Sequence, residues 1–153
     1  MSTLTLLCIG KLKTPWIAEG CRAYADRLCR SVHIDVRELP PSREKDGARQ
    51  AEDESGRLLA AMGKLNICIV LDETGERMTS RDFASFLKTL LETGTTAAFV
   101  IGGAYGLTED VRKAAKHVIR LSDMTLPHEL CRLVFLEQLY RAVEIGKGSG
   151  YHH

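Results

Sequence analysis

Short apolar runs and helical patterns alternate along the first third of the chain. Residues 4–9 are apolar except for Thr5 and are followed by Gly10, which predicts a buried strand. Residues 32–39 alternate apolar and polar side chains, which is typical of a half-buried strand. Between the two, Pro15 opens a helical pattern whose apolar face is predicted to hold Trp16, Ile17, Tyr24 and Leu28.

The middle third begins with a highly charged segment, residues 42–56, in which both signs are mixed. This composition predicts a long polar helix or a mobile loop. Three large apolar residues follow before Gly63, which is predicted to end the helix: Leu58, Leu59 and Met62. They predict that the second half of the helix packs against the core. Residues 66–71 read as an apolar strand. An amphipathic helix follows and ends at Gly94, because apolar residues recur there at helical spacing: Phe83, Phe86, Leu87, Leu90 and Leu91.

Two short apolar strands in the last third run directly into glycine or small polar residues. Residues 97–101 lead into Gly102 and Gly103, and residues 118–121 lead into a loop that ends at Pro127. The carboxyl ends of strands in α/β sheets form ligand crevices, because the backbone there is free to face a ligand. We therefore expect a ligand site in this part of the chain.

Two helices accompany these strands. The first is predicted to begin after Thr108 as its N-cap and to bury Val111, Ala114, Ala115 and Val118. The second spans about residues 128–145, and its apolar positions nearly encircle the helix axis. A helix that is apolar on so much of its circumference is buried on more than one side. In a chain this small, that pattern predicts a subunit interface.

The alternation of strands and helices extends over the whole chain. It predicts an α/β fold with a mainly parallel sheet and helices on both faces. Because the pattern contains no internal repeat, linker or low-complexity segment, we expect a single domain over residues 1–153.

Composition narrows the class of protein without identifying it. The chain is 44% hydrophobic and 27% charged, which is typical of a soluble globular protein. A net charge of +1 excludes a global basic field, so RNA binding would require a local patch or one assembled by two subunits. The five cysteines are odd in number and form no C-x-x-C pair, which favours a reduced, cytoplasmic protein. No apolar run reaches the length of a membrane helix.

The sequence GGAYG at residues 102–106 is a candidate ligand loop. Glycines allow positive φ and let a ligand approach the main chain closely, yet this motif alone is more typical of a plain strand-to-helix turn. It matches neither the P-loop nor the dinucleotide-binding fingerprint. A ligand without phosphate groups requires neither of those motifs.

The start of the last helix carries further candidate residues. His128 and Cys131 have the spacing of a metal pair, but two ligands without a second pair are a weak zinc signal, and we predict no metal site. Arg132 and Arg141 lie further along the same helix. Each is placed either to pair with a glutamate three or four residues away or to contact RNA phosphates.

The chain ends in the sequence GKGSGYHH, whose composition is typical of a disordered end. The two final histidines are also consistent with the remnant of a purification tag. An aromatic and a basic side chain on a flexible tail nevertheless suit stacking on a base and pairing with a phosphate.

Several segments, taken in order, resemble one family. They are LLCIGKLK near the N-terminus, VRELP, IVLDETG, IGGAYG, LSDMTLPHELCRLVFLEQLYRA and the closing Tyr-His. Together they resemble the ribosomal large-subunit pseudouridine N3-methyltransferases, which belong to the SPOUT class of S-adenosylmethionine-dependent RNA methyltransferases. The resemblance spans the whole chain. It implies a C-terminal trefoil knot, with the chain end threaded through the loop that holds the cofactor.

The resemblance also implies a function and its residues. A cytoplasmic homodimer would use S-adenosylmethionine to methylate N3 of a pseudouridine in 23S rRNA, acting on the assembled ribosome. Tyr151 and His152 are the predicted catalytic residues, and either is a candidate general base. Arg132 and Arg141 are predicted to contact substrate RNA. His153 stands where the family usually carries another basic residue. The implied cofactor contacts are Leu71, Gly102, Leu121, Ser122, Asp123, Met124, Thr125 and Leu126.

Two other classes of function stay open. One is a non-catalytic α/β module that binds a nucleotide or RNA and retains the fold. The other is a dehydrogenase-like dinucleotide binder, which the missing fingerprint disfavours. Hydrolase chemistry is disfavoured because the chain has no nucleophile elbow and no HExxH motif. A methyl-transfer assay on ribosomes separates the enzyme from the binding module, and calorimetry with S-adenosylmethionine separates it from the dinucleotide binder.

Overall fold

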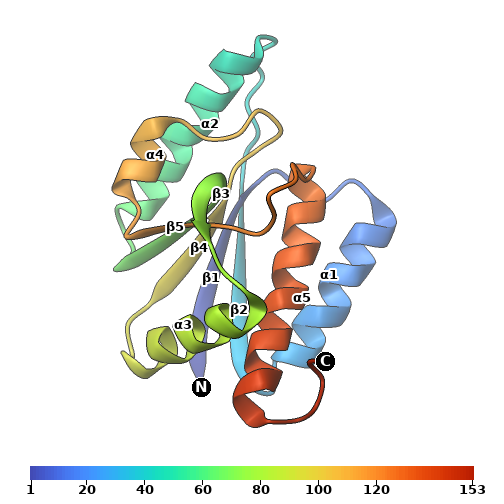
Figure 1. The fold of residues 1–153 in the computed structure, drawn as a ribbon. Helices are drawn as coiled ribbons and strands as arrows, with labels where there is room; N and C mark the ends of the chain where they lie inside the picture. Colours follow the sequence, from blue (N-terminus) through green and yellow to red (C-terminus); the bar gives the residue numbers. More distant parts are fainter.

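Five parallel strands form one sheet in the order β2-β1-β4-β3-β5 (Figure 1). The structure is a computed structural model that describes all residues, 1–153. Its strands are β1 (Ser2–Ile9), β2 (Val32–Leu39), β3 (Ile67–Arg77), β4 (Ala97–Ile101) and β5 (His117–Arg120). Its helices are α1 (Pro15–Leu28), α2 (Gly47–Met62), α3 (Ser80–Glu92), α4 (Glu109–Ala114) and α5 (His128–Lys147). The predicted parallel α/β fold is confirmed.

Helices cover both faces of the sheet, as predicted. On β4, Ala97 and Phe99 pack into a cluster with α1, α3 and α5, whereas Ala98 and Val100 pack into a second cluster with α2 and α4. Successive side chains of a strand point to opposite faces, so each face of β4 receives apolar residues. This two-sided burial explains why the central strands read as continuous apolar runs.

Helix α1 begins at Pro15, as predicted, but its apolar face differs from the predicted one at a single residue. Ile17 and Leu28 are buried, whereas Trp16 is 62% exposed. Adjacent residues of a helix point about 100° apart, so Trp16 cannot share the stripe that Ile17 begins. Cys21, which we did not predict to be buried, lies on that stripe between Ile17 and Leu28.

The charged segment after β2 is helical from Gly47 onward, so the helix interpretation is confirmed for residues 47–56, whereas residues 42–46 form the loop before it. The Asp46 side chain caps α2 by accepting a hydrogen bond from the backbone N–H of Arg49. The helix ends before Gly63, as predicted. It also buries two polar residues that the charge pattern did not indicate, Glu54 and Ser55.

Strand β3 is longer than its apolar run predicts. Its pairing with β5 shifts register between Leu71 and Glu76, so the intervening residues leave the ladder at the carboxyl edge of the sheet. Gly75 lies in this excursion, and a Cβ there would come within 2.6 Å of the Ile119 backbone. Only glycine permits so close a crossing of two chains. The crossing places Asp72 and Glu73 beside the ligand crevice.

The last two helices depart from prediction at their ends. Helix α4 begins after Thr108, but Thr108 makes no side-chain cap, and the helix is too short to bury more than Val111. Ala114 is exposed, and Val118 belongs to β5. Helix α5 continues to Lys147 and packs between α1 and α3 (Figure 1). None of the helices combines the length and apolar character that crossing a membrane requires.

Candidate functional site

A cavity of about 660 Å³ opens at the carboxyl ends of β3 and β4, bounded by the loop between β5 and α5. This volume is within the usual range for small-molecule sites. The lining comes from three separate parts of the chain, and half of the residues are hydrophobic. They are Leu71, Asp72, Glu73, Ile101, Gly102, Gly103, Ala104, Tyr105, Gly106, Leu107, Leu121, Ser122, Met124, Thr125, Leu126, Pro127, His128 and Cys131.

The structure brings seven of the eight predicted cofactor residues into this one cavity, and Asp123 is the exception. The Asp123 carboxylate instead accepts hydrogen bonds from Arg120 Nη1 and Arg77 Nε, each at 3.0 Å. The Arg120 hydrogen bond is the main cause that lowers the pKa of Asp123, and the charge of Arg77 adds to it. Asp123 therefore holds the loop against the end of β3 without facing the cavity.

The GGAYG loop forms a tight turn at the mouth of the cavity. The N–H of Gly106 donates to the carbonyl of Gly103 at 3.1 Å, and Gly106 adopts a φ of +81°. A Cβ on Gly102 would lie 2.7 Å from Leu107 Cδ2, and a Cβ on Gly103 would collide with the carboxylate of Glu54. Gly102 and Gly103 are thus favoured because neighbouring side chains lie close to them, and Gly106 is favoured because of its positive φ.

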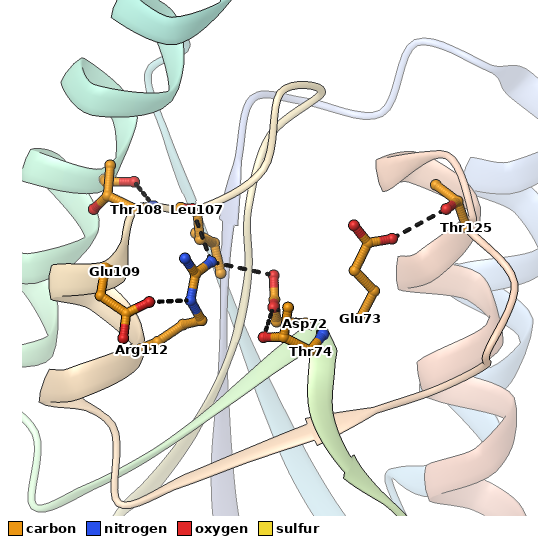
Figure 2. Close-up of polar contacts among 9 residues, drawn as sticks. Asp72, Glu73, Thr74, Leu107, Thr108, Glu109, Arg112 and Thr125 are labelled. Carbon is orange, nitrogen blue, oxygen red and sulfur yellow. Dashed lines mark hydrogen bonds and ion pairs between the residues drawn. The ribbon is translucent and has the colours of Figure 1, made fainter.

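Two carboxylates from the β3 excursion face the cavity (Figure 2). Asp72 lies 3.8 Å from Arg112, whose guanidinium also donates to the Leu107 carbonyl at 2.9 Å. Glu73 accepts a hydrogen bond from the Thr125 hydroxyl at 3.0 Å, which links the end of β3 to the loop before α5. No cation pairs with Glu73. The pocket therefore carries one compensated and one free negative charge.

His128 and Cys131 lie at the base of the cavity, on the first turn of α5. The Cys131 thiol donates to the Leu126 carbonyl at 3.8 Å, and burial raises its pKa. A protonated thiol is a poor metal ligand and a poor nucleophile. No group of three or more histidine, cysteine or acidic side chains is placed to hold a metal ion.

The prediction that Arg132 contacts RNA conflicts with its position, because the residue is only 4% exposed. Its guanidinium donates to Glu38 at 2.6 Å and to the Gly10 carbonyl at 3.0 Å, and its Nε has no partner. The alternative prediction of a partner one turn away on α5 is also wrong for this residue. Arg132 instead joins α5 to the ends of β1 and β2.

Arg132→Met should lower the free energy of unfolding by about 3 kcal/mol, because it leaves Glu38 and the Gly10 carbonyl without their donor. Urea denaturation measures this loss. Arg37→Met is the matched control, since the Arg37–Asp35 pair is about half exposed and should contribute less than about 1 kcal/mol. Equal effects of the two substitutions would contradict a structural role for Arg132.

The C-terminal tail folds back on the second half of α5. The Tyr151 ring packs against Tyr140 at a centroid distance of 4.9 Å, and its hydroxyl donates to Glu137 at 3.2 Å. Arg141 bonds Glu137 at 2.7 Å and lies 3.1 Å from Nδ1 of His152. The glutamate pairing predicted for Arg141 is confirmed, whereas its RNA contact stays a prediction. The tail is ordered by these contacts and does not line the cavity.

Sequence reasoning missed the acidic side of the site. Asp72 and Glu73 directly follow the apolar run of β3. Because ligands bind where such runs end, this acidic pair could have been predicted to line the pocket. Glu54 carried no comparable signal. Its carboxylate supports the GGAYG loop from α2 and accepts the Ser42 N–H at 3.0 Å, a contact between segments that only the fold brings together.

Comparisons with known proteins bear on the whole chain. The model of a family described as predicted SPOUT methyltransferase matches residues 2–152. A protein of Nitratidesulfovibrio vulgaris strain DP4, named ribosomal RNA large subunit methyltransferase H, is 46% identical over 100% of this chain and 99% of its own length. A protein of the same name from Thiobacillus denitrificans is 40% identical and covers 97% of each chain.

Solved structures share the fold at much lower identity. A probable methylase family protein from Haemophilus influenzae aligns with a TM-score of 0.60 and 11% identity, over 98% of this chain and 70% of its own. A probable methyltransferase from Bordetella pertussis aligns with a TM-score of 0.59 and 14% identity, over 93% and 95%. At these identities the likeness supports the fold alone.

Proposed function

The chain belongs to the SPOUT methyltransferase family, and we propose that it methylates N3 of a pseudouridine in 23S rRNA on the assembled ribosome. It is an S-adenosylmethionine-dependent rRNA methyltransferase, like the relatives that match its full length. The observation that carries this function is the cavity itself. Three segments that the family resemblance marks as cofactor contacts converge there from β3, β4 and the loop before α5.

Neither alternative class of function is supported. Relatives that match the whole chain are named as methyltransferases, which favours an enzyme over a non-catalytic binding module. The crevice also lacks the glycine pattern that a dinucleotide binder uses to hold a pyrophosphate.

The residues of the cavity fit S-adenosylmethionine. Apolar side chains such as Leu71, Leu121 and Leu126 can pack against the faces of an adenine ring. The backbone at Gly102 is open to hydrogen bonds with the polar edge of that ring. The free carboxylate of Glu73 complements a cationic sulfonium and an ammonium group. When bound, the cofactor supplies a methyl group activated by the positive sulfur.

Thr125→Val should weaken S-adenosylmethionine binding by about fivefold, because it removes the hydrogen bond that fastens the cofactor loop to Glu73. Calorimetry measures the affinity. Thr89→Val removes a hydroxyl hydrogen bond to Ser85 on the exposed face of α3, far from the cavity, and should leave the affinity unchanged. Unchanged affinity of the Thr125→Val protein would show that the Thr125–Glu73 hydrogen bond does not shape the site.

Methyl transfer to N3 breaks the carbon–sulfur bond as the nitrogen–carbon bond forms, and the N3 proton must leave. Much of the rate comes from alignment of the reacting atoms, which a rigid cavity on strand ends provides. Burial, a hydrogen bond with Tyr24 and the charge of Glu137 raise the pKa of Tyr151 to about 12. Its hydroxyl therefore stays protonated at neutral pH and serves as a donor, which leaves His152 as the candidate base of the tail.

A second copy of the chain completes this proposal. Cys131 and Lys147 are sixteen residues apart on α5, about 24 Å along its axis. The backbone from Lys147 to His152 extends at most about 17 Å. The backbone of the tail therefore falls short of the cavity in its own subunit, and we infer that the tail serves the cavity of a partner. Partly buried apolar residues on α5 are consistent with such an interface: Leu130, Leu133, Tyr140, Val143 and Ile145.

A homodimer working in the cytoplasm, where ribosomes are found, is therefore part of the proposal, and the trefoil knot follows from the fold family. Sedimentation should give a dimer at micromolar concentration. The central test is transfer of a tritiated methyl group to pseudouridine in assembled ribosomes. Label in a base other than pseudouridine, or label only in naked RNA, would contradict the proposed substrate.

A further inference from the structure

Five exposed cations without a carboxylate partner lie on two loops at the carboxyl edge of the sheet. Lys11 and Lys13 lie on the loop after β1, and Arg43, Lys45 and Arg49 lie between β2 and the first turn of α2. No ion pair includes any of the five, whereas most ion pairs elsewhere join an arginine to an acid. We call these five residues the basic rim.

The two parts of the basic rim belong to one surface. The Gly10 N–H donates to the Leu39 carbonyl at 2.7 Å, and a Cβ on Gly10 would lie 3.9 Å from Pro41. The loops that carry the cations therefore leave the same edge of the sheet side by side (Figure 1). This is the edge at which parallel strands β1 to β5 all end.

The basic rim also adjoins the cavity at two points. The backbone N–H groups of Lys13 and Thr14 donate to Glu129, which follows the cavity residue His128. At the other point, Gly47 lies against the ring of Tyr105, because a Cβ there would come within 2.6 Å of it. A polyanion on the rim would thus extend directly over the mouth of the cavity.

The charge of this edge differs from that of the whole chain. The rim segments, residues 10–14 and 40–50, hold five cations and two carboxylates, Glu44 and Asp46. They carry a local excess of three positive charges, although the whole chain carries only +1. Nearby Glu38 and Glu129 are engaged, the first by Arg132 and the second by backbone N–H groups. The remaining surface is correspondingly acidic.

We propose that the basic rim is the surface that binds the phosphate backbone of rRNA next to the target nucleotide. Flexible, unpaired lysines and arginines lose few intramolecular contacts when they bind phosphates, and they release counterions from the RNA. Trp16, which is 62% exposed just beyond Lys13, adds an aromatic face for a base. This inference rests on the proposed function, because it assigns the substrate-binding surface of that same site.

The test replaces all five rim cations with glutamine and measures methylation of assembled ribosomes. We expect KM for ribosomes to rise at least about tenfold and kcat at saturation to stay within about twofold. The salt dependence of kcat/KM should become shallower by about 3.5 to 4.5 in log–log slope, since each of the five lost phosphate contacts lowers it by roughly 0.7 to 0.9. Affinity for S-adenosylmethionine should not change.

A matched control removes the same charge from other surfaces. Five exposed cations without carboxylate partners lie away from the rim: Arg30, Lys64, Lys88, Lys113 and Lys116. Replacing these with glutamine should leave KM and the salt slope near the values of the unaltered protein. An equal effect of the two variants would overturn the proposal, because it would show a response to net charge alone.

Two further outcomes also decide the matter. A rim variant that sediments as a monomer would overturn the proposal, since the cations would then serve the dimer. A rim variant with normal KM would do the same. If the unaltered protein neither binds S-adenosylmethionine nor methylates ribosomes, the proposed function itself fails. Separate variants of Lys11 and Lys13, and of Arg43, Lys45 and Arg49, should each show part of the effect.

Discussion

Gly102→Val is expected to weaken S-adenosylmethionine binding by about 100-fold or more. A Cβ at this position would lie 2.7 Å from Leu107 Cδ2 and 3.3 Å from the Gly106 carbonyl carbon. Valine therefore forces both the Leu107 side chain and the turn at Gly106 to move, and both line the cavity. Overpacking of about 3 kcal/mol confined to the binding site corresponds to this loss of affinity.

The fold should survive the Gly102→Val change, because an overpacking cost of about 1–3 kcal/mol leaves most proteins stable. Calorimetry measures the affinity, and circular dichroism with thermal melting checks the fold. Gly56→Val is the control, since no atom lies within 4 Å of a Cβ at Gly56 and the residue is outside the main cavity. Normal affinity in the Gly102 variant would remove this glycine from the cofactor site.

Much of this fold is predictable because local pattern and tertiary packing agree. The apolar runs of β1, β3 and β4 are buried on both sheet faces, so their sequences leave little choice but a central parallel strand. Helix α3 shows the same agreement, with its capping box at Thr79 and its apolar stripe. The prediction fails for Trp16, which is next to buried Ile17 in the sequence but does not belong to the buried stripe of α1.

The site is only partly predictable, for a different physical reason. Leu71, Gly102 and Leu126 can be assigned from motifs, because backbone and apolar contacts recur at fixed places in such loops. Asp123 lies outside the cavity lining and pairs with Arg120, three residues earlier, and with Arg77 at the end of β3. Arg132 is buried because Glu38, distant in sequence, supplies its counter-charge. Ion pairs between residues distant in sequence, such as Arg77 with Asp123 and Arg132 with Glu38, leave no local signal.

Deleting residues 151–153 should abolish methylation of ribosomes, with a loss of at least about 100-fold. The tail contacts chiefly α5, through Glu137, Tyr140 and Arg141, and contributes nothing to the cavity lining. Affinity for S-adenosylmethionine should therefore stay within about twofold, and the melting temperature should fall by only a few degrees. Normal turnover by the shortened protein would show that Tyr151 and His152 are a structural end and no more.

Mixing the two defective proteins decides where the tail acts. In a mixed dimer, the shortened subunit retains an intact cavity, and the Gly102→Val subunit retains an intact tail. Because the tail of one subunit cannot span the length of α5 back to its own cavity, only a tail acting on the partner builds a complete site in this pair. Random subunit exchange in a two-fold dimer then restores about a quarter of normal activity. Tails that served their own subunits would leave the mixture as inactive as its parts, because every subunit would lack either a cavity or a tail.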